Sequence, residues 1–173
     1  MTGFIIHALK VSDGILAIAP MPGRGGHYTE DLAHLRDWKP ALVISMVTQP
    51  ELAGHGAGSL GGDVQDMGTR WAHVPVTDMD IPGPEAAEAW HVASNAALAA
   101  LQGRGRVLVH CLGGCGRSGM AALRLMIEAG EAPEAAMARL RAIRPCAVET
   151  AEQRAWAFRA AQPPNQSQGI GKE

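Results

Sequence analysis

The sequence predicts an α/β protein whose central, mostly parallel sheet has about four to five strands and is flanked by helices. Short apolar runs alternate with longer segments of helical periodicity through most of the chain, as parallel sheets require. One such run, residues 107–110, leads through a glycine-rich loop into an apolar stretch of helical length. A strand, a tight loop and a helix are therefore expected in direct succession.

Four segments are expected to form strands because they are short and apolar. They are residues 14–19, 41–47, 71–76 and 106–110. Residues 48–69 are rich in glycine and polar residues, and we expect a loop with one short helix there.

Five segments show helical signals, namely apolar spacing of three and four residues, acidic first turns or a proline near the start. They are residues 28–38, 85–102, 117–129, 133–143 and 150–161. Residues 117–129 are apolar almost all round, so we expect that helix to be buried.

Composition indicates one domain, residues 1–161, followed by a flexible tail at 162–173. Apolar residues make up 47% of the 173, but aromatic residues only 4%, so the core must consist mainly of aliphatic side chains. The net charge is −2 and lysine and arginine form no run, which argues against nucleic acid or a membrane surface as partner.

The three cysteines include no C-x2-C pair, so we expect neither a disulfide framework nor a zinc site. The histidines show no metal-ligand spacing, and no cofactor is expected. No apolar run is long enough to span a membrane, and no signal peptide is evident. A reactive thiol also needs reducing conditions, so the expected compartment is the cytoplasm.

The sequence around the expected loop reads His110-Cys111-x5-Arg117-Ser118. A strand that runs through a glycine loop into a helix directs backbone N–H groups and a helix N-terminus at one point, which suits phosphate. The predicted phosphate-binding residues are Leu112, Gly113, Gly114, Cys115, Gly116 and Arg117. Cys111 is the expected nucleophile, because cations and helix N-termini favour a thiolate, and Arg117 can bind two phosphate oxygens at once.

A phosphate ester also needs a proton donor for its leaving oxygen, and the upstream loop offers Asp78 and Asp80. Ser118 could donate a hydrogen bond to the sulfur and make it a better leaving group. His110 either orients the loop or is an ordinary buried histidine at a strand end. Gln153 is the candidate for placing the attacking water, although Thr150-x-x-Gln153 is also a helix capping box.

The other two cysteines have less specific readings. Cys115 either closes a reversible disulfide with Cys111, which would protect the thiolate, or is simply a small residue that fits the turn. Cys146 is expected to be a buried apolar residue.

On these residues the chain resembles the dual-specificity branch of the protein tyrosine phosphatase superfamily, and in particular kinase-associated phosphatases of the cyclin-dependent kinase inhibitor type and their bacterial relatives. The resemblance implies the cysteine-phosphatase fold. That family has an acid loop similar to Pro75-Val76-Thr77-Asp78 with Pro82, which favours Asp78 over Asp80. Its early P-x-P-G segment resembles residues 20–24, and its late R-P-x-A segment, ending in a glutamine, resembles residues 144–153.

Other readings fit less well. Low-molecular-weight phosphatases and arsenate reductases place the aspartate after the cysteine, rhodanese-type loops are usually shorter, and phosphoinositide phosphatases typically carry lysine in the loop. The expected enzyme is a metal-independent phosphomonoesterase, acting on a phosphorylated protein or a small phosphomonoester through a cysteinyl-phosphate. The alternative is a phosphate-binding regulatory module that has lost turnover.

Overall fold

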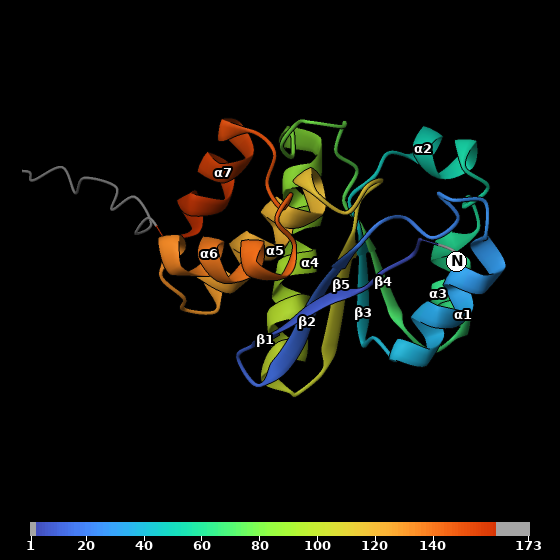
Figure 1. Ribbon diagram of the computed structural model, residues 1–173, viewed down its shortest axis with the longest axis horizontal. Coiled ribbons are helices and arrows are strands. Elements are labelled where there is room, and N and C mark those ends of the chain that lie inside the picture. Colours follow the sequence, from blue (N-terminus) through green and yellow to red (C-terminus); the bar gives the residue numbers. More distant parts are fainter. Residues whose placement is uncertain (1–2, 162–173) are drawn as a thin grey trace, which may run out of the picture.

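The protein is described by a computed structural model, and the residues described are 3–161; the predicted tail at 162–173 lies outside them. A five-stranded sheet forms its centre, in the order β1-β2-β5-β3-β4 (Figure 1). The strands are β1 (His7–Val11), β2 (Gly14–Ala19), β3 (Leu42–Ser45), β4 (Arg70–His73) and β5 (Arg106–His110). Only the β1–β2 pair is antiparallel, so the expected mostly parallel α/β sheet is confirmed.

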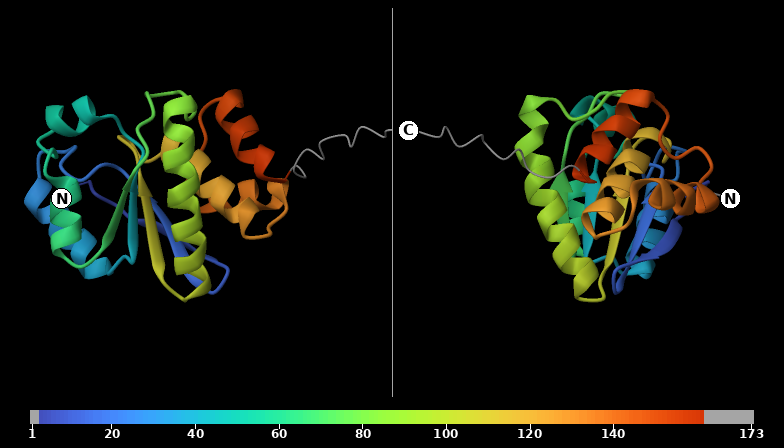
Figure 2. Two further views of the ribbon diagram at one scale, coloured as in Figure 1. Left: turned by 180° about the vertical axis from the view of Figure 1, so that it is seen from behind. Right: turned by 90° about the vertical axis from the view of Figure 1, so that its left-hand side faces the viewer.

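Strands β2, β3 and β5 are almost entirely buried, because helices cover both faces of the sheet. The helices are α1 (Tyr28–Trp38), α2 (Gln49–Gly54), α3 (Leu60–Asp66), α4 (Pro84–Gln102), α5 (Gly116–Glu128), α6 (Pro133–Ile143) and α7 (Ala151–Phe158), with a 3-10 turn at Arg159–Ala161. Figure 2 shows α1 and α3 on one side of the sheet and α4 to α7 on the other.

Two elements differ from the sequence prediction. Strand β1 was not expected; it pairs with β2 along its whole length, from His7 opposite Ile18 to Val11 opposite Gly14. Residues 48–69 contain two short helices rather than one. Helix α2 begins with a capping box between Thr48 and Glu51, and α3 buries Leu60 and Val64. A local cap and a small apolar face are therefore enough to form a short helix in each case.

Helix α5 lies at the centre of the second layer, with nearly every side chain buried, as its composition predicts. Helix α7 packs against α5 and α4 through Trp156, whose ring meets that of Trp90 edge to face at 5.0 Å. The Arg124 guanidinium lies 4.5 Å from the centre of the Trp156 ring and donates to the Trp156 carbonyl. These contacts fix α7 against α5 and α4. Within residues 3–161, no helix is both long and apolar enough to cross a membrane.

Candidate active site

Four chain segments meet at one edge of the sheet, because β2, β5, β3 and β4 are parallel and their carboxyl ends lie together. Residues 20–25 follow β2, residues 111–115 follow β5, residues 46–48 follow β3 and residues 74–83 follow β4. All the predicted catalytic groups except Gln153 lie in or directly beside these segments, and Gln153 reaches them from α7.

The loop between β5 and α5 is shaped by two glycines. Gly114 has a φ of +74°, and a Cβ there would lie 2.7 Å from the nitrogen of Pro20. Gly116 begins α5, and a Cβ there would lie 2.6 Å from a carboxylate oxygen of Glu149 and 3.0 Å from Oε1 of Gln153. The loop therefore packs closely against both the end of β2 and the start of α7; a side chain at Gly114 would meet backbone, and one at Gly116 would displace the side chains of Glu149 and Gln153.

The carbonyls of this loop are held from outside by Arg144, which lies just after α6. Its Nε donates to the Gly114 carbonyl at 3.0 Å and its Nη2 donates to the Gly113 carbonyl at 3.1 Å. In a planar trans peptide the C=O and the following N–H point in opposite directions. The N–H groups of Gly114 and Cys115 therefore point to the opposite side, toward the inside of the loop.

Cys111 lies at the base of this loop and is 3% exposed. Its sulfur is 3.2 Å from the hydroxyl oxygen of Ser118, in the first turn of α5. The sulfur thus has a hydroxyl neighbour, as the sequence predicts, and lies near the positive end of a helix dipole.

Arg117 is 2% exposed, and its guanidinium is held on one edge by Glu51. Nη1 and Nη2 donate to the two carboxylate oxygens at 2.7 and 2.8 Å, and Nη1 also donates to the Val76 carbonyl at 2.8 Å. The guanidinium has five N–H groups, so its Nε–H and the second Nη2–H are not used by these bonds, and Oδ1 of Asp78 lies 3.4 Å from Nη2. The side chain is thereby fixed before a phosphate arrives.

Glu51 is a functional residue that sequence reasoning missed. Burial by itself would raise its pKa, but hydrogen bonds from Arg117 and from Thr48 outweigh that effect and lower the pKa from 4.5 to about 2. Glu51 is therefore ionised at neutral pH. Its place in the Thr48-x-x-Glu51 capping box was visible in the sequence, but its pairing with a residue 66 positions later was not.

His110 is fully buried, and burial is the main cause that lowers its pKa from 6.5 to about 4. The ring is therefore neutral at pH 7. Nδ1 is 3.0 Å from the Cys111 carbonyl, which can only accept, so Nδ1 carries the proton. Nε2 then accepts from the Ser45 hydroxyl at 2.5 Å, and that oxygen accepts from Nε1 of Trp71 at 2.9 Å. This chain of hydrogen bonds joins β4, β3 and β5 to the cysteine's peptide.

The two candidate acids differ in position. Oδ1 of Asp78 lies 3.4 Å from Nη2 of Arg117, and its side chain is 65% exposed at the rim of the site. Each carboxylate accepts from the N–H of the residue that follows it, Met79 for Asp78 and Ile81 for Asp80. The structure thus places the Asp78 carboxylate beside the guanidinium.

Gln153 is buried and makes three contacts. Its Oε1 accepts from the N–H groups of Glu149 and Thr150, at 2.9 and 3.3 Å, and its Nε2 donates to the Asp80 carbonyl at 3.2 Å. The predicted capping box with Thr150 is present. One Nε2 hydrogen remains, and the amide lies against Gly116.

Comparison with known proteins identifies the family. Residues 28–137, more than half of the chain, match the model of the family described as Cyclin-dependent kinase inhibitor 3. The chain belongs to this family. The predicted resemblance is thereby confirmed, and so is the prediction of a cysteine-type phosphatase enzyme. No curated protein matches the sequence significantly.

Solved structures agree with this assignment. Kinase-associated phosphatase, with serine in place of its catalytic-site cysteine, superposes with a TM-score of 0.80 at 22% identity, over 92% of this chain and 94% of that one. Tk-PTP in its active form gives 0.69 at 28% identity, over 90% and 95%. PTPMT1 in complex with PI(5)P gives 0.72 at 17% identity, over 90% and 94%. The matches below 25% identity show the shared cysteine-phosphatase fold.

The predictions for the two remaining cysteines of this family member are wrong. Cys115 does not bond to Cys111, and it is not a free residue that merely fits the turn. It forms a disulfide with Cys146, with 5.2 Å between their Cα atoms. Cys146 is exposed rather than buried. The turn after α6 brings these residues together across 31 positions of sequence, which no local pattern reveals. Cys111 is the remaining free cysteine.

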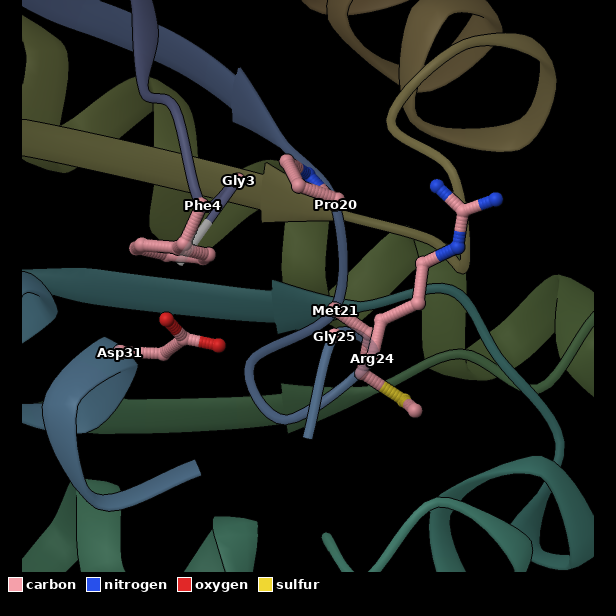
Figure 3. Close-up of a pocket in the computed structure, with 7 residues that line it drawn as sticks. All are labelled: Gly3, Phe4, Pro20, Met21, Arg24, Gly25 and Asp31. Atoms are coloured by element: carbon pink, nitrogen blue, oxygen red, sulfur yellow. The ribbon is translucent and has the colours of Figure 1, made fainter. Parts of the chain in front are cut away.

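Arg24, in the segment after β2, provides a further cation beside the loop. Its guanidinium lies 3.7 Å from the position that a Cβ on Gly113 would occupy. Figure 3 shows this side chain pointing away from Asp31 and Phe4, with which it lines a cavity of about 190 Å³. Among residues 3–161, no group of three or more histidine, cysteine, aspartate or glutamate side chains could hold a metal ion.

Proposed function

We propose that Cys111 attacks the phosphorus of a phosphate monoester while the inward N–H groups of the loop and Arg117 bind its oxygens. The proposal rests on the pre-formed arrangement around one sulfur: Ser118 is 3.2 Å away, and Glu51 holds the Arg117 guanidinium in place through Nη1 and Nη2. Donors that are fixed in advance stabilise the developing charge without reorganisation.

In the first step a bond forms between the sulfur of Cys111 and phosphorus as the bond to the leaving oxygen breaks. Asp78 gives that oxygen a proton. The position of the Asp78 carboxyl at the exposed rim suits a leaving group that faces solvent. The product is a cysteinyl-phosphate.

In the second step water attacks phosphorus, Asp78 takes the proton of the water, and the phosphorus–sulfur bond breaks. Ser118 donates a hydrogen bond to the departing sulfur. The remaining Nε2 hydrogen of Gln153 can orient the water, while the contact with the Asp80 carbonyl links α7 to the acid loop. His110 acts through the Cys111 peptide and touches no reacting atom.

We propose phosphorylated proteins as the substrate class, with phosphotyrosine, phosphoserine and phosphothreonine all accepted, and small phosphomonoesters as the alternative. The open rim, where the Asp78 side chain is 65% exposed, supports a site without a deep selective pocket. A reactive Cys111 needs reducing conditions to remain useful, so we propose the cytoplasm as its compartment.

The first test is release of p-nitrophenol from p-nitrophenyl phosphate in the presence of a metal chelator, by the parent protein and by Cys111→Ser. We expect turnover by the parent alone and retained phosphate binding by the variant. Equal activity of the two proteins would exclude the covalent mechanism. Phosphate binding without turnover by the parent would instead identify the chain as a regulatory phosphate-binding module.

A panel of matched phosphopeptides tests the substrate class. Comparable kcat/KM values for the three phosphorylated residues support the open site. Activity restricted to small phosphate esters would refute a protein substrate.

A further inference from the structure

A disulfide joins the phosphate-binding loop to the turn after α6. Cys115 is half-buried within the loop, and Cys146 is exposed in the turn. A small thiolate from solution can therefore reach the Cys146 sulfur, which is the first requirement for exchange. The expected compartment is reducing, so this bond would be exposed to reductants there.

The turn that carries Cys146 is also the element that orients the loop. Arg144 binds the carbonyls of Gly113 and Gly114, and the N–H of Val148 donates to the Cys115 carbonyl at 3.2 Å. Three successive loop carbonyls are thus held toward the turn. The N–H groups of the next residues consequently point into the anion site, and the disulfide fastens this arrangement at its centre.

We propose that Cys115 and Cys146 form a redox-active pair that sets how tightly the loop holds phosphate. In the disulfide form the loop amides are fixed, and phosphate binds tightly. In the dithiol form only hydrogen bonds hold the loop to the turn. Phosphate binding must then also order the loop, and this entropic cost lowers the affinity for phosphate. This inference rests on the proposed function in that it requires a phosphate site in the loop.

The exchange balances with a thiol of the glutathione class as reductant. One thiolate attacks the Cys146 sulfur and releases Cys115 as a thiolate, forming a mixed disulfide. A second thiolate attacks the sulfur of the first and frees Cys146. The pair gains two electrons and two protons, and the reductant leaves as its own disulfide. Oxidation by glutathione disulfide is the reverse.

The nucleophile is separate from this pair. The chain has three cysteines, and when two are bonded to each other Cys111 has no thiol partner within the molecule. Cys111 is also buried against Ser118. The pair can therefore change state while Cys111 stays a free thiol, so the device regulates the site without consuming its nucleophile.

The test uses the full chain with Cys111→Ser, because Cys115 and Cys146 are then its only cysteines and turnover plays no part. The protein is equilibrated anaerobically in glutathione buffers of graded ratio. Alkylation and mass spectrometry count the free thiols, and calorimetry measures the affinity for inorganic phosphate. We expect the number of free thiols to rise from none to two while the affinity for phosphate falls about three- to tenfold. This fall corresponds to a loss of at most about 1.4 kcal/mol of binding free energy.

Two matched controls carry a second change, Cys146→Ser or Cys146→Ala, and a thermal melt confirms that each is folded. Both should bind phosphate with the weaker affinity at every glutathione ratio. Equal affinity in the two states, a pair that never oxidises, or controls that still respond to the ratio would each overturn the inference. Phosphate that binds in neither state would refute the proposed phosphate site as well.

Discussion

Replacing Glu51 by glutamine tests how the buried Arg117 is held. Glutamine keeps the shape of the side chain but removes the negative charge of the carboxylate that accepts hydrogen bonds from Nη1 and Nη2 of Arg117. Each unit of pKa shift corresponds to about 1.4 kcal/mol, so lowering the pKa from 4.5 to about 2 corresponds to roughly 3 kcal/mol of stability. Breaking a buried ion pair costs about 3–5 kcal/mol, and Arg117 keeps its bond to the Val76 carbonyl, so the lower value is expected.

The sign of the pH dependence follows from the direction of the shift. A carboxyl with a lowered folded-state pKa stabilises the fold fully above its unfolded pKa, here 4.5, and this contribution is lost as pH falls toward about 2. Glutamine does not titrate. The difference in unfolding free energy between parent and Glu51→Gln should therefore be near 3 kcal/mol at about pH 7 and shrink below about pH 4.5.

Urea denaturation at graded pH, followed by tryptophan fluorescence, measures this difference. Glu152→Gln, at an exposed carboxylate in the first turn of α7, is the matched control and should change stability by less than about 0.5 kcal/mol. A Glu51→Gln effect below about 1 kcal/mol, or one that does not vary with pH, would refute the account of Arg117.

Three further changes probe neighbouring groups. Asp78→Asn should lower kcat about 10²–10⁴-fold for poor leaving groups such as phenyl phosphate, and Asp80→Asn should change it little; the reverse order would reassign the acid. Ser118→Ala should slow the second step, seen as a burst of p-nitrophenol before a slower steady rate, and the absence of a burst would place the serine elsewhere in the mechanism. Ser45→Ala leaves Nε2 of His110 and Nε1 of Trp71 without their shared partner, so denaturation should show a loss of about 1–3 kcal/mol; an unchanged midpoint would contradict the hydrogen-bond chain.

The strand–loop–helix unit was predictable because its signals are local. The apolar run to His110, the glycines and the apolar helix after them are consecutive in sequence, and chemistry assigns Cys111 and Arg117 from that order alone. The four parallel strands followed from the alternation of apolar and helical segments, whereas the antiparallel strand β1 was not expected.

The partners that support the site were not predictable, because they come from other strands. Ser45 and Trp71 approach His110 only because β3 lies between β5 and β4. Glu51 follows β3 in a segment whose polar composition suggests a loop. The Cys115–Cys146 bond depends on how the turn after α6 folds back, and an odd number of cysteines argued against it.

The meeting of Trp156 and Trp90 gives the protein a built-in optical signal. Gln153 ties the first turn of α7 to the backbone of the acid loop, and Trp156 lies one turn further along the same helix. Trp90 belongs to α4, which that loop leads into. A shift of the loop when substrate enters would alter how the two indoles face each other, so their emission can follow the motion in real time with no added dye.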